Sequence, residues 1–343
     1  MTSTGNGARP TIADIARRVG VSTAAVSFAL NGRPGVSDAT RQRILDAVEE
    51  LGWHPHRAAR ALSGKQADTV GLVVARPART IGIEPFFAQL VSGLQARLSG
   101  DMVALQLLVV EDKAAEVEVY RRWSAERRTD GFVLLDLEVD DPRPAVLAEL
   151  DVPAVLVGGD GSPQPVPAVF IDDYAAMGQI VEHLVALGHR RVGHVGGIPR
   201  FVHSRRRVAA LEAAAREHDL DVVSVPTDFS ETEAVAVTKQ LVRLPDPPTA
   251  VIYDSDVEAL AGLTVLRDTG LSVPADVSVV SFDDSELARL VAPPLTAMTR
   301  DTFALGGLVA EVLLARLGGS DVEDVVQAPV PELTARESTG AAS

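Results

Sequence analysis

Two pairs of acidic residues are the side chains of this chain with the clearest potential for chemistry. Asp172-Asp173 and Asp283-Asp284 each follow an apolar run, where paired carboxylates could serve acid–base catalysis or cap the next helix. No nucleophile elbow, Walker loop, HExxH or strand-associated GxGxxG accompanies them. The chain has no cysteine, and its seven histidines show no metal-ligand spacing. We therefore expect helix capping at both pairs, no enzyme activity, and no cofactor or metal.

A second group of polar side chains lies near the N-terminus, in a segment with the pattern of three short helices. Thr11, Ser22 and Ser37 are capping hydroxyls at the expected helix starts, and Gly20 and Gly52 end the first and third helices. The apolar stripes that would form one small core are Ile12, Ile15, Ala16 and Val19, then Ala25, Val26, Ala29 and Leu30, then Ile44, Leu45, Val48 and Leu51.

Two helices joined by a glycine turn form a helix-turn-helix, whose second helix enters the DNA major groove. The side chains on or near the face opposite its core stripe are Ser22, Thr23, Ala24, Ser27 and Phe28. The alternative is a solvated helix face capped by Ser22.

The distribution of charge fits that pattern. Residues 1–66 hold nine basic and five acidic residues, a net charge of +4. The remaining 277 residues hold 23 basic and 42 acidic residues, a net charge of −19. A basic head on an acidic body suits a protein that meets phosphates with one end only, although four charges are also within ordinary surface variation.

The rest of the chain alternates apolar runs with helical segments, as in parallel sheets covered by helices on both faces. About 260 residues of this pattern exceed one sheet, so we expect two consecutive α/β lobes. Expected strands are 69–75, 102–110, 131–137, 154–159, 191–197, 249–254 and 277–284. Expected helices are 86–99, 114–128, 174–188, 204–218, 231–244 and 256–270. No export signal or long uncharged apolar run appears, so we expect a cytoplasmic protein without a membrane span.

The run from Pro10 to Leu62 resembles the headpiece and hinge of the LacI/GalR family of transcription regulators nearly residue for residue. The likeness extends to about residue 337, through GLVV (71–74), PFFAQL (85–90), AVFIDDYAAMG (168–178), LGHRRVGHVGG (187–197), PTAVIYDSD (248–256), LSVPADVSVVSFDD (271–284) and PPLTAM (293–298).

The resemblance implies a domain plan. It comprises a disordered tail (1–9), a helix-turn-helix domain (10–56), a hinge helix and linker (57–68), an effector-binding and dimerisation domain (69–337) and a second tail (338–343). The large domain would have two lobes of periplasmic-binding-protein type, one of about 69–167 and 299–325, the other of about 168–298 and 326–337.

The resemblance also implies function: a repressor that binds palindromic operator DNA as a dimer or tetramer and responds to a small-molecule effector, most simply a carbohydrate. A co-repressed or activating regulator is the nearest alternative, because the sequence does not fix which state the effector favours. A periplasmic-type binding protein is the alternative of another class, against which the DNA-reading head and the lack of a signal peptide argue.

The DNA contacts implied by the resemblance are Thr11, Ser22, Thr23, Ala24, Ser27, Phe28, Asn31 and Arg33 in the head, and Arg60, Ala61 and Leu62 in the hinge. In similar proteins the hinge helices enter the minor groove, and the residue matching Leu62 wedges between two base pairs, which is the role we expect here. The alternative, which is compatible with it, is that Ala58, Ala61 and Leu62 pack one hinge on its partner. Phe28 stands where many members carry Arg or His. It should therefore contact a thymine methyl group or turn inward.

The effector contacts implied by the resemblance are Phe87, Arg207, Phe229, Ser255, Asp256 and Asp283, in a cleft at the carboxyl ends of parallel strands. Phe87 and Phe229 could instead be core aromatics, and Asp256 could be a helix N-cap. Arg200, Arg205 and Arg206 form a basic cluster that could receive an anionic ligand or lie exposed at a helix start.

Overall fold

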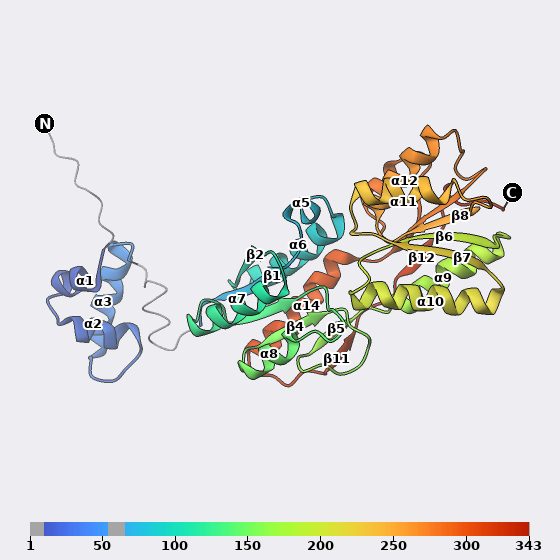
Figure 1. Cartoon of the computed structure of the whole chain (residues 1–343). Helices are drawn as coiled ribbons and strands as arrows, with labels where there is room; N and C mark the ends of the chain where they lie inside the picture. The colour runs from blue at the N-terminus through green and yellow to red at the C-terminus, as the bar shows by residue number, and fades with distance from the viewer. Residues whose placement is uncertain (1–9, 54–65, 343) are drawn as a thin grey trace, which may run out of the picture. The chain divides into compact units, whose positions relative to one another are not determined.

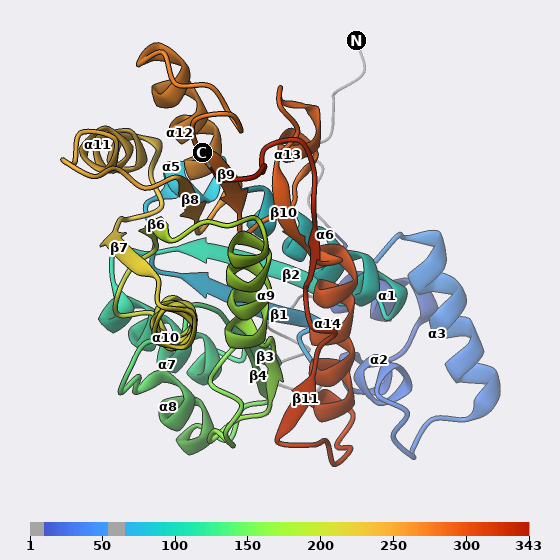
Figure 2. The same ribbon diagram turned by 90° about the vertical axis from the view of Figure 1, so that its right-hand side faces the viewer.

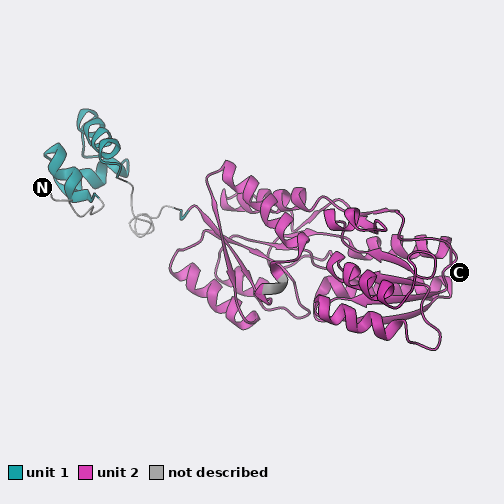
Figure 3. Ribbon diagram, turned by 90° about the horizontal axis from the view of Figure 1, so that it is seen from above, with its two compact units in different colours: residues 1–67 teal, residues 68–343 magenta. Residues whose placement is uncertain are grey.

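The computed structural model describes residues 10–53 and 66–342, apart from the side chains of residues 79 and 80. The chain divides into two compact units, residues 1–67 and residues 68–343 (Figure 3). We call them the headpiece and the body and describe each by itself. No helix among the described residues has the length and apolar character needed to cross a membrane.

The headpiece consists of α1 (Ile12–Val19), α2 (Thr23–Leu30) and α3 (Asp38–Glu50) (Figure 1). Its core follows the expected apolar stripes except in the third helix, where Leu45 is 42% exposed and Ala47 is buried in its place. The buried residues are Ile15, Ala16, Val19, Val26, Ala29, Ile44, Ala47 and Trp53. A capping box starts α1, in which the Thr11 hydroxyl accepts from the amide of Asp14 and the Asp14 carboxylate accepts from Thr11. Gly20 ends that helix with a φ of 74°, a conformation that suits glycine.

The first lobe of the body is built on one parallel sheet of six strands in the order β11-β5-β4-β3-β1-β2. The strands are β1 (Thr69–Val74), β2 (Ala104–Val109), β3 (Gly131–Leu134), β4 (Ala154–Val157), β5 (Ala168–Phe170) and β11 (Val325–Gln327). The interior strands β1, β3 and β4 are fully buried, which explains why their sequences are unbroken apolar runs.

Helices cover both faces of this sheet. They are α5 (Ala78–Ile81), α6 (Pro85–Gly100), α7 (Lys113–Ala125), α8 (Arg143–Glu149) and α14 (Thr302–Leu317). One core joins α6 and α14 to the sheet, and another joins α7 and α8 to its opposite face. Figure 2 shows α6 and α14 side by side. Their backbones meet at Gly93, where an added Cβ would stand 1.9 Å from the carbonyl oxygen of Phe303.

The second lobe has a sheet in the order β12-β10-β9-β8-β6-β7, parallel except for β12, which pairs antiparallel with β10. Its strands are β6 (Arg191–Gly196), β7 (Asp221–Pro226), β8 (Ala250–Tyr253), β9 (Ser278–Ser281), β10 (Thr296–Thr299) and β12 (Glu332–Thr334). The helices are α9 (Asp173–Ala186) and α10 (Val202–His218) on one face, α11 (Glu231–Leu241) and α12 (Asp256–Asp268) on the other, and the short α13 (Glu286–Leu290).

The fold class expected from the sequence is confirmed, with two corrections at the lobe boundaries. The boundary expected at residue 168 is too early, because β5 pairs with β4 and belongs to the first sheet. The boundary expected at residue 326 is also too early, because β11 runs to Gln327 and pairs with β5. The chain therefore crosses between the lobes three times, after β5, after β10 and after β11.

The C-terminal residues expected to form a tail are packed on the second lobe as far as residue 342. Ser338 is fully buried, and its hydroxyl donates to the carbonyl of Val279 over 2.6 Å. The amide of Ala342 donates to the carbonyl of Leu187. The expected N-terminal tail, residues 1–9, lies outside the described residues.

Candidate functional site

Helix α2 of the headpiece presents small polar side chains to solvent. Ser22, Thr23 and Ala24 are exposed at its N-terminus, and Ser27 is half-buried one turn further on. The Ser22 hydroxyl accepts from the amide of Ala25 over 3.1 Å and fixes the start of the helix. The other head residues expected at DNA are exposed (Thr11, Arg33) or half-buried (Asn31, whose amide donates to the Ser27 carbonyl over 2.9 Å). The free amides and hydroxyls of such a helix start are donors suited to phosphate oxygens.

Phe28 is neither turned inward nor fully free. Its side chain is 39% exposed, and a Cβ added at Gly35 would lie 3.4 Å from the ring. Gly35 has a φ of 113°, which a side chain would strain. The ring therefore rests along the turn after α2 and keeps an apolar edge toward solvent.

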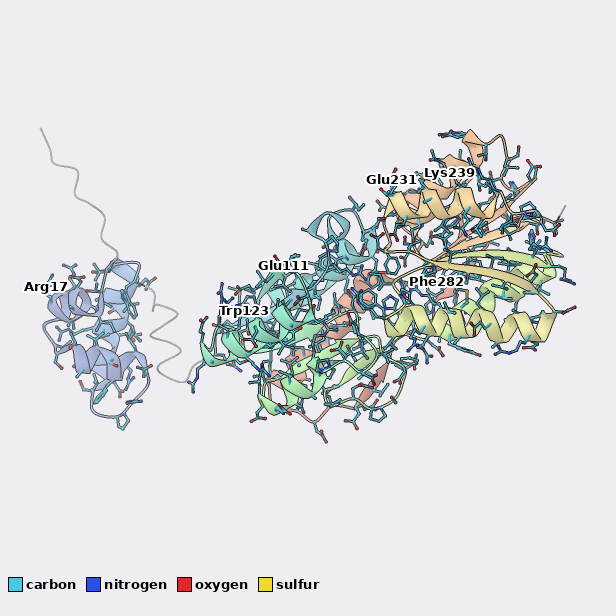
Figure 4. The ribbon with its side chains drawn as sticks, in the orientation of Figure 1. Arg17, Glu111, Trp123, Glu231, Lys239 and Phe282 are labelled. Atoms are coloured by element: carbon cyan, nitrogen blue, oxygen red, sulfur yellow. The ribbon has the colours of Figure 1, made fainter. Side chains whose placement is uncertain are left out.

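Arginines that sequence reasoning counted only as charge hold the headpiece together. Arg41 donates to the carbonyl of Ala29 over 2.7 Å and to that of Arg33 over 3.0 Å, satisfying the end of α2. Arg43 donates to the carbonyl of Val19 over 2.7 Å at the end of α1. Arg17, labelled in Figure 4, pairs with Asp14 at 3.0 Å. The positive charge of this unit thus serves its helix ends as well as its surface. The expected hinge contacts Arg60, Ala61 and Leu62 lie outside the described residues.

A cleft in the body opens at the carboxyl ends of strands from both lobes. It holds a cavity of about 90 Å³, room for several water molecules. All six effector contacts expected from the sequence line it, namely Phe87, Arg207, Phe229, Ser255, Asp256 and Asp283. The topology brings them together from α6, α10, α12 and the loops after β7, β8 and β9.

Arg207 is the most enclosed of the three arginines that line the cleft. The residue is 5% exposed and donates to Asp173 over 3.1 Å and to the main-chain carbonyl of Asp254 over 3.1 Å. Its guanidinium lies 3.6 Å from the ring centroid of Phe282, which is labelled in Figure 4. Burial would raise the pKa of Asp254, but Arg207 and His194 hold that pKa well below its usual range. In the first acidic pair, Asp172 caps α9, as expected from the sequence. Asp173 binds Arg207 instead.

Asp283 has an arginine partner that sequence reasoning missed. Arg300, just after β10, donates to one Asp283 oxygen and lies 4.6 Å from the ring centroid of Phe86 in the first lobe. The neighbouring Asp284 points elsewhere, accepting from Arg336 over 2.7 Å and from Thr299 over 2.7 Å. In the second acidic pair, Asp283 therefore lines the cleft and Asp284 binds Arg336 and Thr299. The helix capping expected of this pair is wrong, because Ser285 is the N-cap of α13.

Ser255, and not Asp256, is the N-cap of α12. Its hydroxyl accepts from the amide of Glu258 and donates to the Glu258 carboxyl group over 2.9 Å. Burial raises the pKa of Glu258 well above its usual range, which favours the neutral form of its side chain. Asp256 is 1% exposed, and its Oδ2 has no hydrogen-bond partner among the described residues. Burial and the nearby Asp283 raise the pKa of Asp256 to about 6.

Both aromatic candidates serve the core and the cleft together. Phe87 is 8% exposed and packs in the first-lobe core while it lines the cavity. Phe229 is 6% exposed and has a φ of 66°, a strained backbone for a bulky residue. Gly197 makes room for it, since a Cβ there would lie 1.9 Å from the ring. Strain of this kind accompanies functional sites more often than plain cores.

A cluster of Arg76, Glu84 and Asp136 at the same cleft was also missed. Arg76 donates to both oxygens of Glu84 at 2.8 Å and to both of Asp136 at 2.7 and 2.8 Å. Its guanidinium also lies 5.2 and 5.3 Å from the ring centroids of Phe201 and Phe229 across the cleft. Burial raises the pKa of Glu84 to about 7, against the effect of Arg76. The signal available was their position, since Arg76 and Asp136 directly follow the apolar runs of β1 and β3.

The basic cluster of the second lobe lies away from this cavity. Arg200 pairs with Glu138 at 2.9 Å, and Arg206 pairs with Asp172 at 2.9 Å. Arg205 lines other surface hollows and not the cleft. Arg200 and Arg205 are therefore exposed near the start of α10, as the second interpretation expects, whereas Arg206 is half-buried against Asp172.

Residues 11–56 match the model of bacterial regulatory proteins of the lacI family, and residues 181–339 match a periplasmic binding protein-like domain. The HTH-type transcriptional regulator CelR of Thermobifida fusca is 37% identical over 338 residues, covering 96% of this chain and 98% of that protein. This chain belongs to the LacI family.

Solved structures agree with that assignment. A complex of the transcriptional regulator CelR with cellobiose is 33% identical and covers 96% of this chain and 100% of its own, with a TM-score of 0.71. The lac repressor dimer bound to operator and the anti-inducer ONPF is 27% identical and covers 97% of this chain and 100% of its own, with a TM-score of 0.83. As a LacI-family member the chain is a DNA-binding transcription regulator and not an enzyme.

Proposed function

We propose that this LacI-family chain is a cytoplasmic repressor whose affinity for a palindromic operator is controlled by a carbohydrate bound in the cleft. The observation that carries the proposal is one chain that joins a helix-turn-helix headpiece to a two-lobed body with a polar, aromatic-lined cleft. The match to the CelR–cellobiose complex over 96% of the chain supports a sugar as the effector. The match to an operator-bound lac repressor dimer supports a homodimer on two half-sites.

In this proposal α2 lies in the major groove. Thr23, Ala24 and Phe28 face base edges, and the capped helix start and Thr11 hold phosphates. Ser27, Asn31 and Arg33 complete the contacts of the head. Arg60, Ala61 and Leu62 act in the minor groove, with Leu62 as the wedge, on the strength of the sequence resemblance alone. Phe28 cannot hydrogen-bond to guanine, so this position favours a thymine methyl group.

The effector contacts in the proposal are Phe87, Arg207, Phe229, Ser255, Asp256 and Asp283. Charged groups give directional hydrogen bonds to hydroxyls, and the two aromatic rings cover the apolar face of a sugar ring. Because residues from both lobes line the cavity, a ligand there favours one lobe arrangement over another. The coupling to DNA binding is then about 1 to 3 kcal/mol, the usual size for allosteric pairs of sites.

The test is footprinting of the full chain on the DNA upstream of its own gene, repeated with cellobiose and other sugars. Two protected half-sites about one helical turn apart, released by a sugar, support the proposal. The Asp283→Asn variant is the matched control, since it should keep the footprint and lose the sugar response. Protection strengthened by sugar indicates a co-repressed regulator. A footprint that no sugar alters contradicts effector control.

A further inference from the structure

The cleft carries an excess of negative charge. Its lining includes six carboxylates, Glu84, Asp136, Asp173, Asp254, Asp256 and Asp283, against three arginines, Arg76, Arg207 and Arg300. The remaining titratable group is His203, and burial lowers its pKa to about 4, so that it is neutral at pH 7. The formal charge of the lining is therefore −3 when all carboxylates are ionised.

Every arginine in the lining is already paired. Arg76 holds Glu84 and Asp136, Arg207 holds Asp173 and Asp254, and Arg300 holds Asp283. A phosphate or carboxylate on a ligand would have to break one of these ion pairs to find a cation, and it would enter a negative field. The arrangement thus disfavours an anionic ligand, which was one of the two interpretations of the basic cluster Arg200, Arg205 and Arg206 in the sequence.

Asp256 is the exception among the six carboxylates. No basic side chain among the described residues pairs with it, and its buried Oδ2 lacks a hydrogen-bond partner. An unpaired buried acceptor costs about 1 to 3 kcal/mol, and more when it is charged. Burial raises the pKa of Asp256, and the charge of a second carboxylate, Asp283, raises it further. Hydrogen bonds from the Ser285 side chain and from the main-chain amides of Asp256 and Val257 lower that pKa in part, but they bring no positive charge. The chain therefore buries a carboxylate that has no cation partner among the described residues, and a cationic group of a ligand would supply one.

We propose that the effector is an amino sugar whose ammonium group binds at Asp256 and Asp283. This inference rests on the proposed effector function of the cleft. A primary ammonium supplies three donors and one positive charge, so it satisfies Oδ2 and relieves the repulsion between the two carboxylates. A neutral hydroxyl supplies one donor and leaves the charge excess in place. A metal ion fits less well, because no group of three potential ligands occurs among the described residues. The rings of Phe87 and Phe229 cover the sugar face.

The test compares two disaccharides of nearly the same shape. Chitobiose, two β-1,4-linked glucosamines, carries amines where cellobiose carries hydroxyls, and N,N′-diacetylchitobiose carries the same nitrogens without charge. Calorimetric titration of the full chain at pH 7 should show chitobiose binding at least tenfold more tightly than either neutral sugar. Asp256→Asn should reduce that preference to less than twofold. Asp268→Asn, the same charge change at the exposed far end of α12, should leave it unchanged.

The pH profile gives a second readout. The titratable and charged groups that line the cavity with Asp256 are Glu84, Asp136, Asp173, Asp254, Asp283, Arg76, Arg207, Arg300 and His203. As the pH falls from 7 to 5, Asp256, whose pKa is about 6, and Glu84, whose pKa is about 7, both take up protons, while the amines of chitobiose become more fully protonated. Because Asp256→Asn keeps the titration of Glu84 and of the ligand, the preference for chitobiose over cellobiose should fall several-fold more in the wild type than in Asp256→Asn.

Tighter binding of cellobiose, equal binding of the two sugars, or a preference that survives Asp256→Asn overturns the inference. Cellobiose binding would still leave the proposed effector function standing. Tighter binding of glucose 6-phosphate than of glucosamine overturns the charge argument directly. Failure of every sugar to bind also overturns it, and the footprint on operator DNA then decides separately whether the DNA-binding half of the proposed function stands.

Discussion

Replacing Arg207 with methionine should destabilise the body by about 3 to 5 kcal/mol, the usual cost of removing one partner from a buried ion pair. Asp173 is 4% exposed and Asp254 is 1% exposed, so neither carboxylate can recover its lost partner from bulk water. Methionine keeps much of the apolar stem over Phe282, which limits the change mainly to the charge. The effector response should disappear for the same reason, because the lining loses its most enclosed cation.

Urea denaturation followed by circular dichroism measures the effect, with Arg216→Met as the control. Arg216 is exposed on the same helix, so its replacement should cost less than about 0.5 kcal/mol. A deficit below about 1 kcal/mol for Arg207→Met, or one equal to that of the control, would refute the view that this ion-pair network holds the second lobe. Operator binding measured below the transition then shows whether the headpiece is unaffected.

The pH dependence gives an independent check on the same variant. In the intact protein Arg207 and His194 keep the pKa of Asp254 below its unfolded value despite burial. Its stabilising contribution is therefore complete above about pH 5 and is lost only in more acidic solution. Without Arg207, burial acts with less opposition and raises that pKa. The folded variant then takes up a proton more readily, and its deficit should be smaller at pH 5 than at pH 7.5. A deficit independent of pH would argue against an uncompensated carboxylate.

Three further substitutions test separate parts of the molecule. Phe28→Ala should cost less than about 1 kcal/mol of stability, since the ring is 39% exposed. It should nevertheless change which base pair is preferred at one operator position, and binding to a set of single-base operator variants measures that preference. Glu258→Gln should cost less than about 1 kcal/mol at pH 7 in urea denaturation, because burial raises the pKa of the wild-type side chain and favours its neutral form. A loss above about 3 kcal/mol would mean that it is ionised. Leu62→Ala should weaken operator binding several-fold while the salt-dependent affinity for random DNA stays the same, and an equal loss of both would exclude a wedge.

Local sequence signals were enough for the headpiece. Capping hydroxyls, glycine stops and apolar stripes specify α1, α2 and α3 without distant partners, because each helix is short and its caps lie within a few residues. The strands at the centres of the two sheets were equally readable, since burial on both faces demands unbroken apolar runs. Helix α14 was not among the expected helices, although it forms part of the first-lobe core.

Three very short strands were missed for a physical reason. Strands β5, β11 and β12 each have three residues, too few to show a periodicity, and they exist only because a neighbouring strand offers hydrogen bonds. Strand pairing over a few residues also explains why the expected lobe boundaries were too early. Contacts with distant residues likewise explain why the expected C-terminal tail is packed on the second lobe.

The sequence by itself determined the family, the two-unit plan, the two-lobed α/β body and the six residues of the expected effector group that line the cleft. Only the tertiary structure decided which charges meet there. Arg76 pairs with Asp136 from another part of the chain, and Arg300 pairs with Asp283. Both pairings depend on distances of a few ångströms that no local pattern encodes. The lack of an ion-pair partner for Asp256 among the described residues is also decided by the tertiary structure, because the three arginines of the lining pair with other carboxylates.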